Sequence, residues 1–292
     1  MFIATLVADG LAAGQLSDAV DRLAAAGCTP GAWRWLDEGR AADVEFGAHP
    51  DLARGALEGA FAACDVIVQP AAGREKKLLV ADMDSTMITV ECIDELADYA
   101  GIKAQIAEVT ERAMRGELDF GAALDARVGL LKGLEEGAID RCLAERVRDS
   151  IGAEIVVKTM AARGAATVLV SGGFTRFAGP VGARLGFQRV IANVLEIDAG
   201  KLTGTVTKPI VDSATKETTL LAVREELGLS QEQTLAVGDG ANDLAMIRVA
   251  GLGVAYRAKP IVAAAAGARV DHTDLTTLLY AQGIPRSEWV NV

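Results

Sequence analysis

Three short apolar segments, each followed at once by polar or glycine residues, most strongly limit the fold of this 292-residue chain. They are residues 78–81, 167–170 and 234–237, and long helix-forming stretches lie between them. Continuous apolar runs of this length are typical of strands buried on both faces of a parallel sheet. The sequence therefore predicts an α/β fold with a Rossmann-like parallel sheet, whose reactive side chains lie beyond the carboxyl ends of the strands.

A long stretch rich in Ala, Leu, Glu and Arg lies between the first two of these strands, over about residues 93–162. Glycines punctuate it, and glycine is a frequent helix terminator. We expect a helical insertion into the sheet domain. The expected breaks fall at Gly101, Gly116, Gly133 and Gly152.

The beginning of the chain follows a different pattern, with the order β-α-β-β-α-β. This order predicts a small α+β unit of the ferredoxin-like type. Residues 70–75 are polar and turn-rich, so we expect a linker there. Two domains result, residues 1–72 and residues 77–292. The expected strands are 2–8, 32–36, 42–46 and 65–68, and the expected helices are 17–26 and 51–63.

Charge and composition exclude several classes of protein. Lys and Arg number 29 against 40 Asp and Glu, a formal net charge of −11, whereas a protein that binds a nucleic-acid backbone needs a basic face. No apolar stretch reaches the roughly 18 residues that a membrane span requires. The chain start lacks the basic segment of a secretory signal, and the four cysteines form no C-x-x-C pair. We therefore expect a cytoplasmic protein that binds neither nucleic acid nor membrane.

Two carboxylates, those of Asp82 and Asp84, follow the first apolar strand and can converge on one pocket. Sugar-nucleotide transferases and calcium loops also use an Asp-x-Asp pair. A calcium loop would need glycine and glutamate where Met87 and Ile93 stand, so that interpretation fails. For this pair taken alone, a structural interpretation stays open, in which the polar residues at the strand end only cap the next helix.

The other two strands run into glycine-containing segments, residues 171–173 and 238–243. The first can bring backbone N–H groups and a serine hydroxyl to a phosphate, although alone it would more often be an ordinary turn. The second adds two carboxylates and an amide, which could also merely cap a helix. Lys216 lies between them, and alone it would be a solvated helix lysine. The coincidence of these groups at three strand ends is what favours a catalytic site.

Taken together, the motifs resemble those of the haloacid dehalogenase-like phosphohydrolase superfamily. The resemblance spans about residues 77–254. The residues that match its four motifs are Asp82, Asp84, Thr86, Ser171, Lys216, Gly238, Asp239 and Asp243.

A closer resemblance is to the phosphoserine phosphatases of that superfamily. Glu91 stands nine positions past Asp82, and residues 114–120 are followed by Arg127. From its position between the first two motifs, we expect the insertion, residues 93–162, to act as a mobile cap that excludes water during phosphoryl transfer. The N-terminal unit is similar to the ACT-like regulatory modules that some members carry.

The resemblance implies a reaction through an aspartyl-phosphate. Asp82 would attack phosphorus, and Asp84 would protonate the leaving alkoxide and later take a proton from the hydrolytic water. Partial burial and a neighbouring carboxylate would raise the pKa of Asp84, which the acid role requires. Lys216 would offset the charge on the phosphoryl oxygens.

A group of carboxylates that binds a phosphate needs more positive charge than the sequence supplies. Mg²⁺ fits oxygen ligands and a phosphate substrate. The resemblance implies that the carboxylates of Asp82 and Asp239 and the backbone carbonyl of Asp84 hold this ion. Asp243 would belong to its outer shell.

The resemblance also implies which residues bind the substrate. Ser171, Gly172 and Asn242 would form hydrogen bonds to the phosphate or the substrate. Glu91 would pair with the substrate ammonium, and Arg127 would hold its carboxylate through two parallel hydrogen bonds. Without the resemblance, a helix-start acid and a surface arginine would be the simpler interpretations of these two.

The implied function is hydrolysis of O-phospho-L-serine to L-serine and phosphate, the last step of serine biosynthesis. Another small-molecule phosphatase or a phosphotransferase of the same superfamily is the alternative. A phospho-acceptor signalling protein is disfavoured, because an acid/base at Asp84 would shorten the life of the phosphorylated state. The N-terminal unit could bind an amino-acid effector or form the surface of a homodimer, and the sequence does not decide between them.

Overall fold

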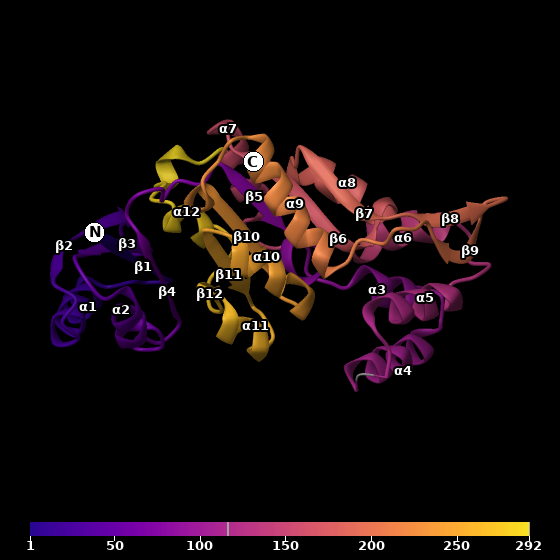
Figure 1. Ribbon diagram of the computed structural model, residues 1–292, viewed down its shortest axis with the longest axis horizontal. Helices are drawn as coiled ribbons and strands as arrows, with labels where there is room; N and C mark the ends of the chain where they lie inside the picture. Colours follow the sequence, from indigo (N-terminus) through magenta and orange to yellow (C-terminus); the bar gives the residue numbers. More distant parts are fainter. Residues whose placement is uncertain (116, 292) are drawn as a thin grey trace.

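The computed structural model describes residues 1–115 and 117–291, and it does not describe the side chain of Met114. Gly116, one of the expected helix breaks, therefore lies outside the described residues. Within them the chain forms a four-stranded sheet, a six-stranded sheet and a two-stranded hairpin. Figure 1 shows the four-stranded sheet at the N-terminal end, the six-stranded sheet in the middle and the hairpin at the opposite end. No helix of the described chain is both long and apolar enough to cross a membrane.

The six-stranded sheet is parallel throughout. Its strands are β5 (Leu78–Ala81), β6 (Ala166–Phe174), β7 (Arg189–Asn193), β10 (Thr234–Gly238), β11 (Leu252–Tyr256) and β12 (Ala268–Val270). Their order is β12-β11-β10-β5-β6-β7, so the three strands predicted from the sequence are neighbours. The predicted α/β fold with a parallel sheet is confirmed. The carboxyl ends of β10, β5 and β6 meet at one edge, where the chain order reverses direction across the sheet.

Helices cover both faces of this sheet. They are α7 (Ala153–Ala162), α8 (Thr175–Leu185), α9 (Ser213–Glu226), α10 (Leu244–Val249), α11 (Pro260–Ala265) and α12 (Thr277–Ala281). Leu79 and Ala81 of β5 belong to the core that includes α7, α8 and α12, whereas Leu78 and Val80 belong to the core that includes α9, α10 and α11. Successive strand residues point to opposite faces, so a strand buried on both faces must be apolar at every position.

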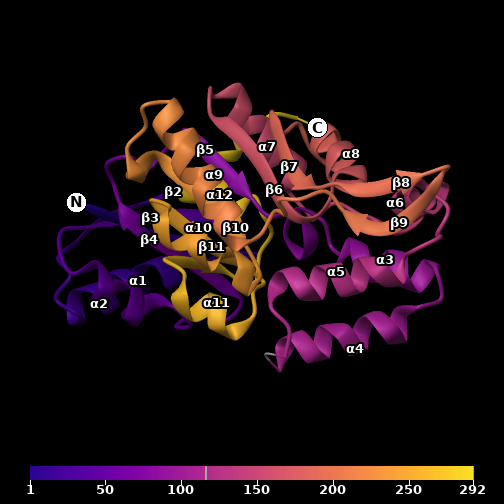
Figure 2. The same cartoon turned by 45° about the vertical axis from the view of Figure 1, so that its right-hand side comes forward.

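The expected insertion is largely helical. Its helices before α7 are α3 (Cys92–Tyr99), α4 (Lys103–Met114), α5 (Phe120–Leu130) and α6 (Gly137–Arg146). Figures 1 and 2 show α3, α4 and α5 standing beyond the edge of the parallel sheet, whereas α7 packs against β6 and α8. The helices of the expected insertion therefore divide between a projecting group and the layer that covers the sheet.

A hairpin that the sequence pattern does not predict extends the projecting group. It consists of β8 (Leu195–Asp198) and β9 (Lys201–Val206), and β9 packs against α5. The backbone N–H of Gly133 donates to the carbonyl of Leu202, and the N–H of Leu202 donates to the carbonyl of Leu134. Two chain segments far apart in sequence therefore form this part of the molecule.

The N-terminal unit has the predicted element order. Its elements are β1 (Phe2–Ala8), α1 (Ala13–Ala25), β2 (Pro30–Asp37), β3 (Ala41–Phe46), α2 (Pro50–Leu57) and β4 (Cys64–Pro70). The antiparallel sheet order β2-β3-β1-β4 is that of a ferredoxin-like fold. Two predicted boundaries are wrong. Helix α1 begins at Ala13 rather than Ser17, and α2 ends at Leu57 rather than residue 63, because Gly59 has a φ of +72° that does not continue a helix.

The predicted linker carries a buried arginine that joins the N-terminal sheet to the parallel-sheet domain. The two terminal nitrogens of Arg74 donate to the carboxylate of Asp43 over 2.6 and 2.7 Å, and one of them also donates to the hydroxyl of Thr5. The same guanidinium donates to the carbonyls of Tyr280 and Ala281 near the C-terminus. We call this contact between the N-terminal sheet and the C-terminal part of the chain the seam, and it is therefore partly polar.

A second buried carboxylate at this seam is that of Asp65 on β4. It accepts hydrogen bonds from the backbone N–H groups of residues 271–273 and from the hydroxyl of Thr273. Three successive backbone N–H groups that converge on one carboxylate form a small anion-binding concavity. The contacts of Arg74 and of Asp65 therefore hold the N-terminal sheet against the rest of the chain.

Candidate active site

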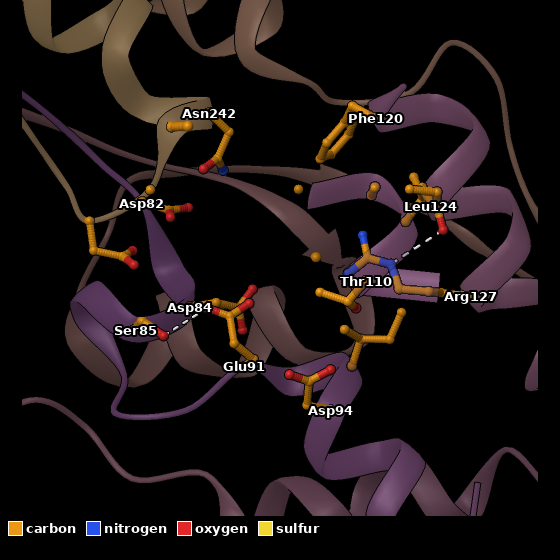
Figure 3. A pocket seen from close by; sticks show the side chains of 18 of the residues that line it. Asp82, Asp84, Ser85, Glu91, Asp94, Thr110, Phe120, Leu124, Arg127 and Asn242 are labelled. Atoms are coloured by element: carbon orange, nitrogen blue, oxygen red, sulfur yellow. Dashed lines mark hydrogen bonds between the residues drawn. The ribbon is translucent and has the colours of Figure 1, made fainter. Parts of the chain in front are cut away.

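A cavity of about 570 Å³ lies where the carboxyl ends of β5, β6 and β10 face the projecting helices. Figure 3 shows its walls, with Asp82, Asp84 and Glu91 on one side and Arg127 and Phe120 across from them. The predicted site residues that line it are Asp82, Asp84, Glu91, Arg127, Gly172, Asp239 and Asn242. The remaining three, Ser171, Lys216 and Asp243, are buried behind its wall and hydrogen bond to residues that line it.

Lys216 lies on α9 and is fully buried, so it is not a solvated helix lysine. Its Nζ is 2.5 Å from Oδ1 of Asp82 and 2.6 Å from Oδ1 of Asp243. Burial by itself lowers the pKa of Lys216, but the two carboxylates outweigh it and hold the pKa above its ordinary value. The ammonium therefore stays charged between two acids.

Asp82 directly follows β5 and is buried, and its backbone N–H donates to the carbonyl of Val237 on the neighbouring strand. Burial, followed by the charge of Asp243, raises the pKa of Asp82 well above its usual range, and Lys216 only partly opposes this shift. One lysine therefore does not balance the acids of this wall.

Asp84 is held by both of its carboxylate oxygens. Oδ1 accepts from the backbone N–H of Cys92 over 2.9 Å, and Oδ2 accepts from the hydroxyl of Ser171 over 3.3 Å. A Cβ at Gly173 would lie 2.8 Å from Oδ2, so only glycine allows this approach. Burial, followed by the charge of Glu91, raises the pKa of Asp84 to about 6. A raised pKa is what a proton-donating role of Asp84 would need.

Asp239 and Asp243 come from the segment after β10. Asp239 Oδ1 accepts from the hydroxyl of Thr86, and burial and the charge of Asp243 raise the pKa of Asp239 to about 6. Asp243 Oδ2 accepts from the backbone N–H groups of Asp239 and Gly240. Any side chain at Gly238 would overlap the Asp243 carboxylate, which explains the glycine there.

The carboxylates of Asp82, Asp239 and Asp243 lie within 4.8 Å of one another and could hold a metal ion. Their ligand atoms are all oxygens, which suits a hard divalent cation. Burial, followed by the charge of Asp243, raises the pKa values of Asp82 and Asp239, and a bound divalent cation would favour their charged forms. Asp243 already uses one oxygen for Lys216 and the other for two backbone N–H groups. Asp82 and Asp239 are therefore the better direct ligands.

Residues 171–173 belong to the carboxyl-terminal part of β6, which extends past the expected strand end at residue 170, and hydrogen bonds brace them. The hydroxyl of Ser171 accepts from the N–H of Gly173, and the carbonyl of Gly172 accepts from the side-chain amide of Asn193 over 2.8 Å. Asn193 also binds both backbone polar groups of Val211. The sequence analysis missed Asn193. It ends the apolar strand β7 as the other site residues end theirs, and that pattern could have found it.

The projecting helices supply Glu91 and Arg127. Arg127 on α5 is half-buried, its Nε donates to the carbonyl of Ala123, and it forms no ion pair within the described part of the chain. Burial lowers the pKa of Arg127, while the charges of Asp94 and Glu91 oppose that shift. Four polar or charged lining residues were missed by the sequence analysis, namely Ser85, Asp94, Thr110 and Lys259.

Comparison with known proteins gives the family. The model of the haloacid dehalogenase-like hydrolases matches residues 79–248, which include both the β5 and β10 motifs. This chain belongs to the haloacid dehalogenase-like hydrolase family. The predicted resemblance to phosphoserine phosphatases is also confirmed, because the chain is 46% identical over 236 residues to the phosphoserine phosphatase of Streptomyces coelicolor, across 80% of this chain and 57% of that one.

Solved structures extend the comparison to the whole chain. A haloacid dehalogenase family hydrolase from Salmonella enterica serovar Typhi matches 99% of this chain and 100% of its own, with a TM-score of 0.86 and 28% identity. A phospho-aspartyl intermediate analogue of phosphoserine phosphatase matches 70% of this chain and 98% of its own, with a TM-score of 0.65 and 37% identity. The chain spans only 57%, 64% and 53% of the first three curated relatives that it matches.

Proposed function

We propose that this chain is a phosphoserine phosphatase that hydrolyses O-phospho-L-serine to L-serine and phosphate, the last step of serine biosynthesis. The observation that carries the proposal is that one cavity is lined both by the acids that follow β5 and β10 and by Glu91 and Arg127. The first set suits phosphoryl transfer, and the second suits the two charged ends of an amino acid. The similarity to phosphoserine phosphatases supports the same substrate.

In the first step, an oxygen of Asp82 attacks phosphorus and the bond from phosphorus to the serine oxygen breaks. Lys216 already binds Oδ1 of Asp82, so Oδ2 is the oxygen that can attack. Asp84 gives its proton to the leaving alkoxide, and a pKa near 6 is compatible with that role. In the second step water attacks phosphorus, Asp84 takes a proton from that water, and the acyl-phosphate bond breaks.

We propose Asp82, Asp239 and the backbone carbonyl of Asp84 as the groups that would hold Mg²⁺. When bound, this ion would neutralise charge on the phosphoryl oxygens. Asp243 would act from the outer shell of the ion. One of its oxygens binds Lys216, and the other accepts from the backbone N–H groups of Asp239 and Gly240. Ser171, which donates to Asp84, would help to place that acid.

For the substrate, we propose that Glu91 pairs with the ammonium and Arg127 with the carboxylate of phosphoserine. Both line the same cavity, and Arg127 forms no ion pair in the described chain that would compete. Gly172 and Asn242 would donate hydrogen bonds to the phosphate or the substrate from the opposite wall. A planar guanidinium suits a carboxylate because it can form two parallel hydrogen bonds.

We further propose that the protein acts in the cytoplasm and that residues 1–72 and 77–292 are separate domains. The projecting helices α3, α4 and α5, together with α6, which packs against α3, and the hairpin β8–β9, would be the mobile cap. A protease-protection experiment with Mg²⁺ and a phosphate mimic tests the cap, and unchanged cleavage would contradict its closure. An effector site or a homodimer surface on the N-terminal domain stays a prediction.

A phosphate-release panel tests the function. We expect the kcat/KM for phosphoserine to exceed that for glucose 6-phosphate by about 10²-fold or more, because a site built for two charged groups rejects substrates that lack them. Arg127→Met should raise the KM for phosphoserine and leave the turnover of p-nitrophenyl phosphate unchanged. Faster turnover of sugar phosphates by the wild-type protein would contradict the substrate assignment.

A further inference from the structure

We infer that Ser85 is a positioning residue that holds the Glu91 carboxylate in place for the substrate ammonium. Ser85 lies next to Asp84 and lines the cavity, but it has no part in the chemistry proposed above. The inference rests on the proposed function and deepens it, because it names a group that determines specificity for amino-bearing phosphate esters.

The first observation is the backbone of Ser85. Its φ is +55° and its ψ is 2°, in the left-handed region, within the π-type turn η1 (Met83–Met87). Residues other than glycine rarely adopt this conformation, and when they do it is often at a functional site. A hydrogen bond from the Ser85 N–H to the carbonyl of Val90 closes the loop and holds the unusual conformation.

The second observation is what this conformation does with the side chain. The hydroxyl of Ser85 donates to Oε1 of Glu91 over 2.7 Å, as the dashed line in Figure 3 shows. Within the described chain this is the one hydrogen bond to the Glu91 side chain, which is otherwise exposed. Oε1 is thereby occupied and Oε2 is left for a ligand in the cavity.

An exposed glutamate without this contact would sample several rotamers, and binding would then have to fix one of them. The hydrogen bond from Ser85 fixes one rotamer of Glu91 before the substrate binds. It also connects the Glu91 carboxylate to the loop that carries Asp82 and Asp84, so the ammonium subsite keeps a constant position relative to the reacting phosphorus. The expected effect is on the binding of amino-bearing substrates and not on the chemical step.

Three phosphate esters separate these effects. Phosphoserine has both an ammonium and a carboxylate, phosphoethanolamine has only the ammonium, and phosphoglycolate has only the carboxylate. In Ser85→Ala, KM should rise about tenfold for the first two, which is the usual scale for a lost hydrogen bond to a charged group. With phosphoglycolate, both kcat and KM should stay within about twofold of the wild type.

Two further variants separate the hydroxyl from the backbone. Ser85→Gly removes the hydroxyl but adopts the left-handed conformation without strain. It should match Ser85→Ala, and wild-type behaviour of Ser85→Gly would overturn the inference. Thr89→Ala is the matched control, because it removes a hydroxyl of the same loop that bonds to the carbonyl of Arg148 outside the cavity. It should leave all three substrates unchanged.

A double-mutant cycle with Glu91→Gln completes the test. If Ser85 acts through Glu91, the effects of Ser85→Ala and Glu91→Gln on KM for phosphoserine should be far from additive. Additive effects, or equal losses with phosphoglycolate, would overturn the inference, because they would indicate general damage to the loop. Wild-type protein that prefers phosphoglycolate to phosphoserine would refute the proposed function itself, and with it the role of Glu91.

Discussion

Two clusters of buried charge in this molecule have opposite character. At the seam with the N-terminal sheet, Arg74 binds Asp43, and their side chains are 8% and 0% exposed. In the cavity wall, Lys216 binds Asp82 and Asp243, and all three are buried to a similar degree. Burial alone therefore does not distinguish a structural charge from a functional one.

The balance of charge does distinguish them. At the seam the Asp43 carboxylate is paired with two guanidinium groups, that of buried Arg74 and, over 3.4 Å, that of exposed Arg34. The remaining donors of Arg74 reach a hydroxyl and two carbonyls. In the cavity one ammonium faces several carboxylates, and burial, followed by the charge of a neighbouring carboxylate, raises the pKa values of Asp82, Asp84 and Asp239. A carboxylate that is matched by guanidinium groups stabilises the fold, whereas a surplus of acid requires a proton or a cation and marks a site of chemistry.

Replacing a carboxylate in each cluster should give the largest contrast. Asp82→Asn should lower kcat for phosphoserine by about 10⁴ or more, because the nucleophile is lost, while circular dichroism should detect no loss of fold. Asp43→Asn should keep kcat within about twofold of the wild type and lower the melting temperature. An assay of phosphate release measures kcat, and thermal unfolding measures the melting temperature. Substantial turnover by Asp82→Asn would refute the nucleophile assignment.

Removal of divalent ions should affect only the acid-rich cluster. After exhaustive treatment with EDTA, we expect phosphate release to fall by about 10³ and to recover when Mg²⁺ is added, because the surplus of carboxylates repels a phosphate dianion. The same treatment of Asp43→Asn should cause the same relative loss. Full activity in the chelated wild-type protein would contradict the need for a cation.

Arg74→Met should act on stability alone. We expect the free energy of unfolding in urea to fall by about 3 kcal/mol, because the change leaves the buried Asp43 carboxylate with only the exposed Arg34 as an ion-pair partner, at 3.4 Å. Adding Asp43→Leu should recover much of that loss, since the buried charge is then gone.

The matched control for this change is Arg22→Met, which removes an arginine from an ion pair with Asp18 on the surface. Both side chains of that pair are more than 40% exposed, so we expect a loss of about 0.5 kcal/mol or less. A loss at Arg22 as large as that at Arg74 would show that the seam is not a special contact.

The sequence predicts the parallel sheet well because its strands must be apolar at every position, and residues 78–81 coincide with β5. The acids and glycines that follow the strands are predictable for the same reason, because parallel strands end at one edge. The resemblance to a known family then assigns roles that geometry alone would leave open. Arg127 is an example, since its position opposite Glu91 becomes evident only in three dimensions.

Other features depend on contacts between distant segments, and local patterns do not predict those. The hairpin β8–β9 is short and half-exposed, and it is held partly by α5. Arg74 resembles a linker residue in sequence, and its burial follows from how the N-terminal sheet docks. Ser85 has no sequence signal for a left-handed backbone, which glycine or asparagine would have given.

The most direct test of this account is to trap the covalent intermediate. The wild-type protein should be quenched during turnover of phosphoserine, treated with borohydride and mapped by mass spectrometry. Borohydride reduces an acyl-phosphate to an alcohol, so we expect the modification at Asp82 alone. Rapid release of phosphate with Asp82 unmodified, or a modification at another carboxylate, would contradict the claim that the acid-rich cluster holds the nucleophile.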